Sequence, residues 1–93
     1  MAWLYLLHCA DGSYYCGSTR AGLDRRISEH NARAFAGYTA ARLPVRLVFS
    51  QEFERSEDAI SAERQVKGWS RAKKEALIAG DYGRLKGLAS RRG

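Results

Sequence analysis

No stretch of this sequence is long and apolar enough to cross a lipid bilayer. A membrane-spanning helix needs about 20 consecutive apolar residues, and no apolar run here approaches that length. The sequence also lacks the charged segment, apolar stretch and small-residue cleavage site of a secretory signal peptide. We therefore expect no membrane association and predict a cytoplasmic protein.

Cysteine is scarce as well, since Cys9 and Cys16 are the two cysteines of the chain. A small domain from a compartment that forms disulfides usually carries more of them. We therefore expect two reduced thiols with a packing role.

The familiar motifs of metal and phosphate chemistry are missing too. The sequence contains no Cys/His set at zinc spacing, no glycine-rich phosphate loop and no nucleophile elbow. Internal repeats and inter-domain linkers are also absent, and a chain of 93 residues can build only one core. We predict a single domain over residues 1–80 and a basic, partly ordered C-terminal tail over residues 81–93.

Acidic residues are outnumbered by basic ones. Sixteen Lys and Arg against ten Asp and Glu give a net charge of +6. Such an excess favours anionic partners, of which nucleic acid is the most common. A basic surface that only keeps the protein soluble is the alternative that charge leaves open.

What the sequence does contain begins with the segment WLYLLHCADGSYYCG, residues 3–17. Two short runs with aromatic residues, Trp3–Cys9 and Ser13–Ser18, predict strands. The dipeptide Asp11-Gly12 between them is typical of a turn. The segment therefore predicts a β-hairpin.

The length of this turn decides where the tyrosines lie. A two-residue turn would place Tyr5 and Tyr15 on opposite faces of the hairpin. A three-residue turn of Ala10, Asp11 and Gly12 would place both on one face, with Tyr5 opposite Gly17. In that register, the missing side chain at Gly17 would leave space for a phosphate or another backbone. The residues alone leave both registers open.

Periodicity and end signals predict the remaining elements, with Ser56 and Ser70 beginning helices and Gly80 ending one. These elements are a helix from Leu23 to about Ala34, a basic aromatic loop Phe35–Leu43, a strand Val45–Phe53, a helix from Ser56 to Gly68 or Trp69, and a helix Arg71–Ala79. The order strand, strand, helix, strand, helix, helix predicts an α/β (α+β) protein, a three-stranded antiparallel sheet flanked by helices.

Several segments in fixed order resemble the GIY-YIG nuclease domain. They are WLY at 3–5, YCG at 15–17, LDRRISEHN at 23–31 and ERQVKGWSRAKK at 63–74, with the two motif tyrosines ten positions apart. The similarity covers Trp3 to about Ala79 and is closest to the small stand-alone bacterial branch, the YhbQ/YazA-like or UPF0213 proteins. It implies the GIY-YIG fold and both tyrosines on one face, and therefore the three-residue turn.

The resemblance also implies a catalytic set. Its members are Tyr5, Tyr15, Arg26, His30 and Glu63. Arg26 would match the catalytic arginine, whose planar charged fork suits phosphate oxygens. Glu63 would bind one divalent ion, Mg²⁺ or Mn²⁺. On periodicity alone Glu63 would be a solvated carboxylate paired with Lys67, four residues later.

In that set, one tyrosine would be the general base, and we favour Tyr15 over Tyr5. A tyrosine accepts a proton only as phenolate, and its pKa would have to fall from about 10 under the influence of Arg26 and the metal. His30 could polarise a tyrosine hydroxyl or contact a phosphate. The late asparagine of many family members has no counterpart here, and Ser70, Arg71 or Lys74 could make its contact instead.

The function that the resemblance implies is metal-dependent hydrolysis of DNA, duplex or branched, with low sequence specificity and a role in repair or recombination; RNA stays open as a substrate. Basic and aromatic residues outside the catalytic set are predicted to contact nucleic acid. They are Arg20, Arg25, Tyr38, Arg42, Lys67, Arg71, Lys73 and Lys74. Two alternatives are a nucleic-acid-binding module with little or no turnover and an adaptor whose basic face docks an acidic protein.

Overall fold

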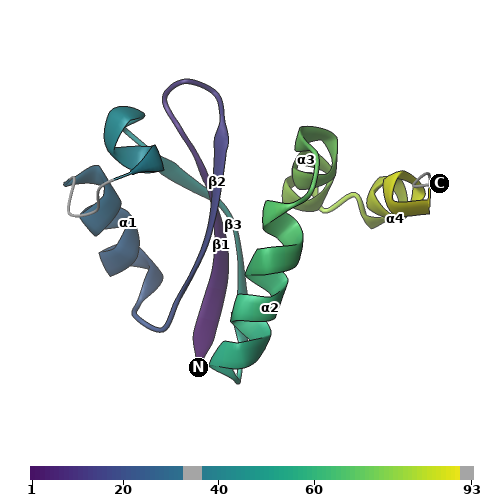
Figure 1. Cartoon of the computed structure of the whole chain (residues 1–93), viewed down its shortest axis with the longest axis horizontal. Coiled ribbons are helices and arrows are strands. Elements are labelled where there is room, and N and C mark those ends of the chain that lie inside the picture. Colours follow the sequence, from purple (N-terminus) through teal and green to yellow (C-terminus); the bar gives the residue numbers. More distant parts are fainter. Residues whose placement is uncertain (33–36, 91–93) are drawn as a thin grey trace.

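The computed structural model describes residues 1–32 and 37–90, which form a three-stranded antiparallel sheet with helices on both faces (Figure 1). The strands are β1 (Ala2–His8), β2 (Tyr14–Thr19) and β3 (Arg46–Phe53), in the order β2-β1-β3. Strand β1 is central and almost wholly buried. Its run of aromatic and aliphatic residues fits a strand that is covered on both faces.

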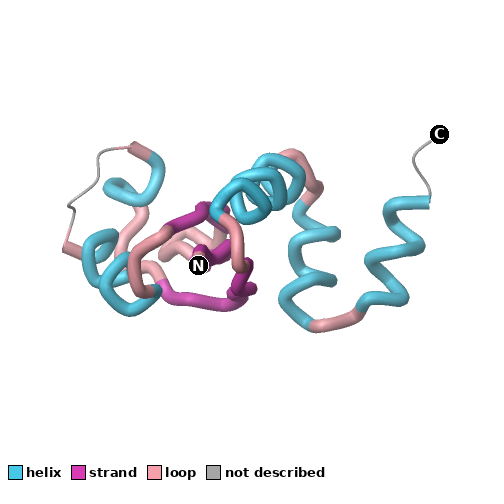
Figure 2. The backbone as a smooth tube through the Cα atoms, turned by 90° about the horizontal axis from the view of Figure 1, so that it is seen from below, coloured by secondary structure: helices cyan, strands magenta, loops and turns pink. Residues whose placement is uncertain are grey.

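Helices cover the two faces of the sheet from opposite sides (Figures 1 and 2). Helix α1 (Leu23–Asn31) and the short 3₁₀ helix η1 (Tyr38–Ala41) lie on one side; α2 (Ser56–Lys67) and α3 (Arg71–Ala79) lie on the other, and α4 (Tyr82–Ser90) packs beside α3. The predicted fold class is therefore confirmed, with one α-helix, α4, and one 3₁₀ helix, η1, beyond those that the sequence predicts. None of these helices, over residues 1–32 and 37–90, has the length and apolar composition that crossing a membrane requires.

Side-chain alternation along β1 divides the core into two clusters. Leu4 and Leu6 point toward α2 and α3, where they meet Val66 and Leu77, whereas Leu7 belongs to the cluster on the α1 side. Full burial of each such leucine contributes roughly 1.5–3 kcal/mol. The two halves of the core therefore hold α1 and α2 in place across one thin sheet.

Both cysteines are free thiols inside this core. Cys16 belongs to the cluster under α2 and α3, and Cys9 to the cluster on the α1 side. Because their strands turn them toward opposite faces, each fills space in a separate half of the core, as expected for packing residues.

The hairpin turn has three residues, Ala10 to Gly12. The Cys9 N–H donates to the Ser13 carbonyl at 2.8 Å, and the Gly12 N–H donates to the Cys9 carbonyl at 3.0 Å. Gly12 takes a φ of +87°, the left-handed conformation that glycine adopts without steric cost. The turn sets Tyr5 opposite Gly17 and Tyr15 opposite Leu7. Of the two registers left open, the one that places both tyrosines on one face is therefore the observed one.

The structure agrees with the sequence at both ends of α3 and at the start of α2. The Ser70 side chain caps α3 by accepting from the Lys73 N–H at 3.2 Å, and Gly80 ends that helix in the left-handed conformation. Helix α2 begins at Ser56, as predicted, with Arg55 in the N-cap position, and the Ser56 hydroxyl donates to the Glu57 carboxylate. The acidic residues behind Ser56 still suit the positive end of the helix dipole.

The segment between α1 and β3 differs from the expected loop. Residues 38–41 form η1, and its neighbour Arg42 donates to the Tyr38 carbonyl at 2.9 Å. Helix α1 ends at Asn31, so the predicted continuation to about Ala34 falls partly outside the described residues. The side chain of Asn31 replaces a strand partner, because it bonds both the N–H and the carbonyl of Val45.

A second difference lies at the C-terminus, where the sequence predicts a tail from Asp81 and the structure has α4. Asp81 begins this helix: its carboxylate accepts from the Arg84 N–H at 3.0 Å. Leu85 packs against the core cluster under α3. Gly83 and Gly87 lower the helix propensity of this segment, which is why its periodicity is weak in the sequence.

Candidate active site

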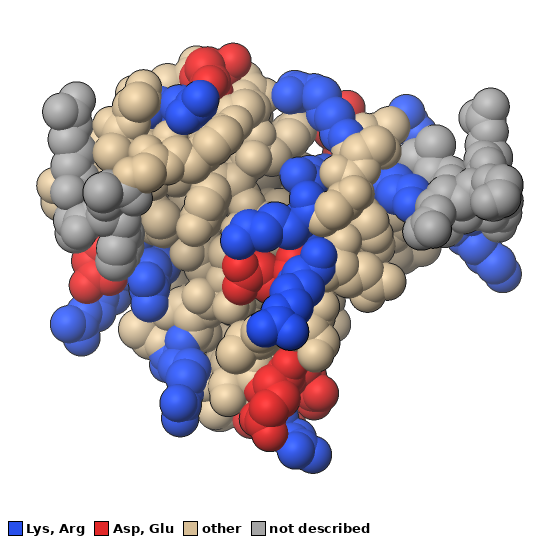
Figure 3. Space-filling view, viewed as in Figure 1, with Lys and Arg blue, Asp and Glu red and all other residues tan. Residues whose placement is uncertain are grey.

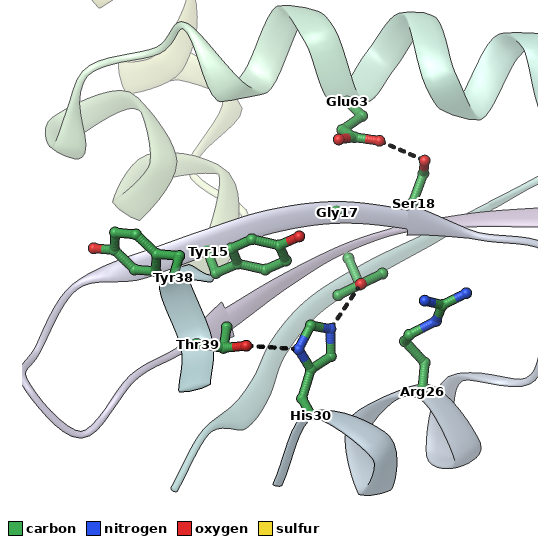
Figure 4. Close-up of a pocket in the computed structure, with 9 residues that line it drawn as sticks. Tyr15, Gly17, Ser18, Arg26, His30, Tyr38, Thr39 and Glu63 are labelled. Carbon is green, nitrogen blue, oxygen red and sulfur yellow. Dashed lines mark hydrogen bonds between the residues drawn. The ribbon is translucent and has the colours of Figure 1, made fainter. Parts of the chain in front are cut away.

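The candidate site is built around the edge strand β2. A cavity of about 300 Å³ lies beside Gly17 and is lined by residues from both sides of the sheet. Figure 4 shows Glu63 reaching toward Gly17 and Ser18 from α2, while Arg26 and His30 approach from α1 on the opposite side. The residues lining the cavity are Tyr5, Tyr15, Gly17, Ser18, Arg26, His30, Tyr38, Thr39 and Glu63. The structure thus brings all five residues of the predicted catalytic set to one cavity.

A buried chain of hydrogen bonds forms the floor of the cavity. The Tyr5 hydroxyl and His30 Nε2 share a hydrogen bond of 3.1 Å, and His30 Nδ1 shares one of 2.9 Å with the Thr39 hydroxyl. All three side chains are buried. Because both ring nitrogens of His30 are engaged, the imidazole is held in one orientation between β1 and η1.

Burial keeps this chain uncharged. It raises the pKa of Tyr5 far above its ordinary value, an effect that the neighbouring Tyr15 and Glu63 increase and Arg26 only partly offsets. Burial also lowers the pKa of His30, and the positive charge of Arg26 lowers it further while Glu29 opposes both. At neutral pH, Tyr5 is therefore a phenol and His30 a neutral imidazole, so Tyr5 is poorly suited to accept a proton.

Gly17 is required because the Tyr5 ring lies directly against it. A Cβ atom built at Gly17 would come within 2.6 Å of both Cζ and the hydroxyl oxygen of Tyr5, and within 3.1 Å of Tyr15 Cε2. The missing side chain at Gly17 predicted open space here for a phosphate or another backbone. The structure corrects this, because the phenol ring of Tyr5 fills that space.

Arg26 is anchored to the end of β2. Its Nε donates to the Thr19 hydroxyl oxygen at 3.2 Å, and the Glu29 carboxylate lies 4.0 Å from the same Nε. The Thr19 hydroxyl oxygen also accepts from the Ala21 N–H at 3.0 Å, which fixes the entry into α1. The guanidinium is thereby held at the cavity by one edge, as a phosphate-binding arginine would be.

Glu63 projects from α2 and is held from two directions. The Ser18 hydroxyl donates to its Oε1, and Lys67 Nζ donates to its Oε2 at 2.8 Å. Burial alone would raise the pKa of Glu63, but the hydrogen bonds from Lys67 and Ser18 outweigh it and the pKa is lowered. The Lys67 pair expected from spacing is thus present, and the same carboxylate also lines the cavity.

The donor set fits a hard divalent cation held mainly by water and substrate. Among residues 1–32 and 37–90, no cluster of three or more His, Cys, Asp or Glu side chains could hold a metal ion. An ionised carboxylate in a polar cavity is nevertheless a suitable anchor for Mg²⁺, which usually keeps several waters and binds one or two carboxylates plus phosphate oxygens. Glu63 is the residue of this cavity that can supply that carboxylate.

Five of the eight residues predicted to contact nucleic acid lie in three places. Tyr38 lines the cavity, with Arg42 over its ring, and Lys67 lies at Glu63. Arg71 lies at the hairpin, where it donates to the Gly12 carbonyl at 2.8 Å and covers the Tyr14 ring. Arg25 is paired with Glu29 at 3.4 Å on α1.

The remaining three are spread over the surface. Arg20 lines a neighbouring cavity beside the first residues of α2. Lys73 lies over the Trp69 ring at 5.9 Å. Burial and the charge of Glu63 raise the pKa of the Cys16 thiol, and the positive charge of Lys74 partly offsets that rise. Figure 3 shows Lys and Arg side chains gathered around acidic groups in the middle of the face that carries α2.

Sequence reasoning missed Ser18, Thr19 and Thr39. Strand alternation could have placed Ser18 on the α2 side with Cys16, and so beside Glu63. Thr19 ends β2 just before the turn into α1, where a hydroxyl often accepts from a nearby backbone N–H. Thr39 has no such signal, because it meets His30 only through the packing of η1 on α1.

Comparison with known proteins gives consistent matches. A sequence model of the family described as GIY-YIG catalytic domain matches residues 1–76. The UPF0213 protein of Streptococcus pneumoniae serotype 4 is 45% identical over 78 residues, which cover 84% of this chain and 78% of that protein. The UPF0213 protein of Natronomonas pharaonis is 42% identical over 81 residues, covering 87% and 94%.

Two solved structures are similar as well. The solution NMR structure of the UPF0213 protein BH0048 from Bacillus halodurans shares 44% identity at a TM-score of 0.55, covering 85% of this chain and 84% of that one. The solution NMR structure of the protein EF2693 from E. faecalis shares 34% identity at a TM-score of 0.57, covering 86% and 84%.

Proposed function

This chain belongs to the GIY-YIG nuclease family, among its UPF0213 relatives, and from that premise we propose that it is a metal-dependent endonuclease that hydrolyses DNA phosphodiester bonds. The observation that carries the proposal is the single cavity lined by Tyr5, Tyr15, Arg26, His30 and Glu63. These side chains come from four elements, so only the folded chain assembles them. Each has a use in phosphodiester hydrolysis.

Tyr15 is the proposed general base. Tyr5 keeps its proton, because burial raises its pKa and its hydroxyl is bonded to His30. Tyr15 lies on the same face of the sheet, only half-buried, and its ring faces the same cavity. A base positioned by the protein contributes about 10²- to 10⁴-fold to such a reaction.

Arg26 and His30 have binding and positioning roles in this proposal. The guanidinium of Arg26 would stabilise charge that develops on phosphoryl oxygens, and its anchor on Thr19 keeps it in place before substrate arrives. Neutral His30 would hold the Tyr5 hydroxyl in a fixed direction toward the cavity. Neither residue needs to change charge during the reaction.

Glu63 would hold the divalent ion, which supplies charge stabilisation and assistance to the leaving oxygen when bound. To do so, its carboxylate must exchange the hydrogen bonds that it makes in the metal-free protein. We expect low sequence specificity, because the lining groups are suited to phosphate and sugar contacts, which carry no sequence information.

The test is a cleavage assay with supercoiled plasmid and branched DNA, with Mn²⁺ or Mg²⁺ and with chelator. We expect nicking that requires the metal and falls at least about 100-fold in Tyr15→Phe, the loss of a positioned base. Glu63→Gln should be equally defective, because the amide keeps the shape of the side chain but loses its charge. Tyr82→Phe, at an exposed tyrosine of α4, is the matched control.

Wild-type protein that cuts no better than Glu63→Gln would overturn the proposal. Salt-dependent binding of DNA that ignores metal and Tyr15→Phe would instead identify a binding module without turnover. Circular dichroism of each variant confirms that a loss of cleavage is not a loss of fold.

A further inference from the structure

Three planar side chains form a continuous row at the mouth of the cavity. The rings of Tyr15 and Tyr38 are stacked at 6.2 Å between centroids, with 29° between their planes. The guanidinium of Arg42 lies 3.9 Å from the centre of the Tyr38 ring. Figure 4 shows Tyr38 beside Tyr15, on the part of the cavity away from Arg26. The row therefore leads from the proposed base outward to solvent.

The outer member of this row is held in place by its own contacts. Arg42 Nε donates to the Asp11 carboxylate at 2.9 Å, and its Nη1 donates to the Tyr38 carbonyl at 2.9 Å. The Ala10 N–H donates to the Arg42 carbonyl at 2.9 Å, which joins this residue to the hairpin turn. Because Asp11 already pairs with the charge of Arg42, the guanidinium is better suited to stacking than to a phosphate.

The row also keeps open surface. Tyr38 is 41% exposed, and the side chain of Arg42 is 35% exposed. A single exposed aromatic residue is ordinary on a protein surface. This one differs because two fixed planar neighbours hold its ring and because the same ring lines the cavity.

We propose that the Tyr38–Arg42 platform, the exposed part of this row, binds one unpaired nucleobase on the outer plane of the Arg42 guanidinium, which the Tyr38 ring supports from its other side, next to the phosphate that occupies the cavity. The inference rests on the proposed function and adds a substrate class, nucleic acid with a single-stranded nucleotide at the cut. Aromatic rings and arginine planes are the usual surfaces on which splayed bases stack. In an intact duplex both faces of a base are already covered by its neighbours, so a paired base cannot use the platform.

Binding assays in chelator test this inference without any cleavage. Fluorescence anisotropy would compare a single-stranded DNA oligonucleotide, the blunt duplex of the same sequence and the matching single-stranded RNA. We expect Tyr38→Ala to weaken single-strand binding about tenfold, the size of one base-stacking contact, because the guanidinium of Arg42 loses the ring that holds its plane, and to leave duplex binding within about twofold. Tyr38→Phe should bind like wild type, and Tyr82→Ala is the control for removal of an exposed tyrosine.

A 2-aminopurine base in the single strand gives a direct readout of stacking. Its fluorescence should be quenched by wild type and by Tyr38→Phe, and remain unquenched with Tyr38→Ala. Equal quenching by the RNA strand would support the same nucleobase site for both sugars, whereas quenching by DNA alone would identify DNA as its source.

Two results would overturn the inference: an equal loss of duplex and single-strand binding in Tyr38→Ala, or quenching that persists in that variant. Its failure is distinct from failure of the proposed function, which is measured by metal-dependent cutting. A protein that cuts DNA but shows no Tyr38-dependent quenching would keep the nuclease and lose the platform. A protein that stacks a base but never cuts DNA would keep the platform and overturn the proposed nuclease function.

Discussion

His30 is the titratable residue whose environment departs most clearly from what its position in the sequence indicates. In the sequence it is a polar residue near the end of a predicted helix. In the structure it is buried, bonded on both nitrogens and has a lowered pKa because of burial and the charge of Arg26. The consequence is a pH dependence of stability that belongs to this residue.

We expect the free energy of unfolding to fall as the pH is lowered below about 6.5, the ordinary pKa of histidine. Below that value the unfolded chain binds a proton at His30 that the folded chain does not bind until its own lower pKa is reached. Stability is therefore full above pH 6.5 and is lost progressively between that pH and the folded pKa. Urea denaturation at pH 7.5, 6.5 and 5.5 measures the slope.

The control for this prediction is His30→Gln, which removes the titrating group and should lose most of the slope. Asp11 and Glu63 stay ionised in this window because hydrogen bonds from Ser13 to Asp11, and from Lys67 and Ser18 to Glu63, lower their pKa values. Equal slopes in wild type and His30→Gln would contradict the assignment.

Single residues also show where sequence reasoning reached its limit. The register that places Tyr5 and Tyr15 together was one of two options, because turn length decides it and Asp-Gly suits both lengths. The sequence could not predict that the Tyr5 ring fills the space at Gly17, because this depends on the direction of the Tyr5 side chain. Thr39 was missed because its partner is 9 residues away and meets it only in the packed fold.

At the scale of elements, α2 carries both the proposed metal ligand and its competitor. Glu63 and Lys67 lie one turn apart, so the ammonium of Lys67 neutralises the carboxylate in the metal-free protein. Because the two residues are four apart on one helix, their side chains are neighbours and the ion pair forms at a small cost in free energy. A divalent ion at Glu63 has to compete with it.

We therefore expect Lys67→Met to bind Mn²⁺ about two- to fivefold more tightly than wild type, a factor that corresponds to one partly exposed ion pair. Titration calorimetry or electron paramagnetic resonance of Mn²⁺ without DNA measures it. Lys73→Met removes the same charge on α3, over Trp69 and away from Glu63, and should bind Mn²⁺ like wild type. Unchanged or weaker binding in Lys67→Met would show that Lys67 does not compete for the carboxylate.

The elements divide clearly into those that sequence predicts and those that it does not. Helix α3 was predicted at both ends because Ser70 and Gly80 are direct end signals. Helix α4 was missed because Gly83 and Gly87 interrupt its pattern, although Asp81 is a good cap. The 3₁₀ helix η1 was missed because four residues are too few to show a period.

At the scale of the whole molecule, the excess of six positive charges does not translate into six groups that can contact a bound phosphate backbone. Lys67 of α2 pairs with Glu63, and Lys73 of α3 lies over Trp69. Figure 3 shows Lys and Arg side chains gathered around acidic groups in the middle of one face. Others are paired within one helix, as Arg25 is with Glu29. Net charge therefore overstates the number of groups that reach a bound phosphate backbone.

Salt dependence of duplex binding, measured in chelator, should separate the two groups. Each phosphate contact contributes about 0.9 to the slope of log K against log salt, so Lys74→Gln should lower the slope by about that amount. Arg25→Gln should leave the slope unchanged, because that side chain is held by Glu29 on α1. If Arg25→Gln lowers the slope as much as Lys74→Gln does, the duplex follows a different path over the surface.

The edge position of β2 has a consequence for how this domain can be joined to other proteins. Within residues 1–32 and 37–90, β2 is an edge strand that pairs with β1 alone, and its residues Gly17 and Ser18 line the cavity. A strand donated by a second chain, or by an appended domain, would normally extend a sheet at such an edge. Here it would run beside Gly17 and Ser18 and obstruct the cavity, so we expect compatible assemblies and fusion proteins to attach through β3 or the outer helices and to leave β2 unpaired.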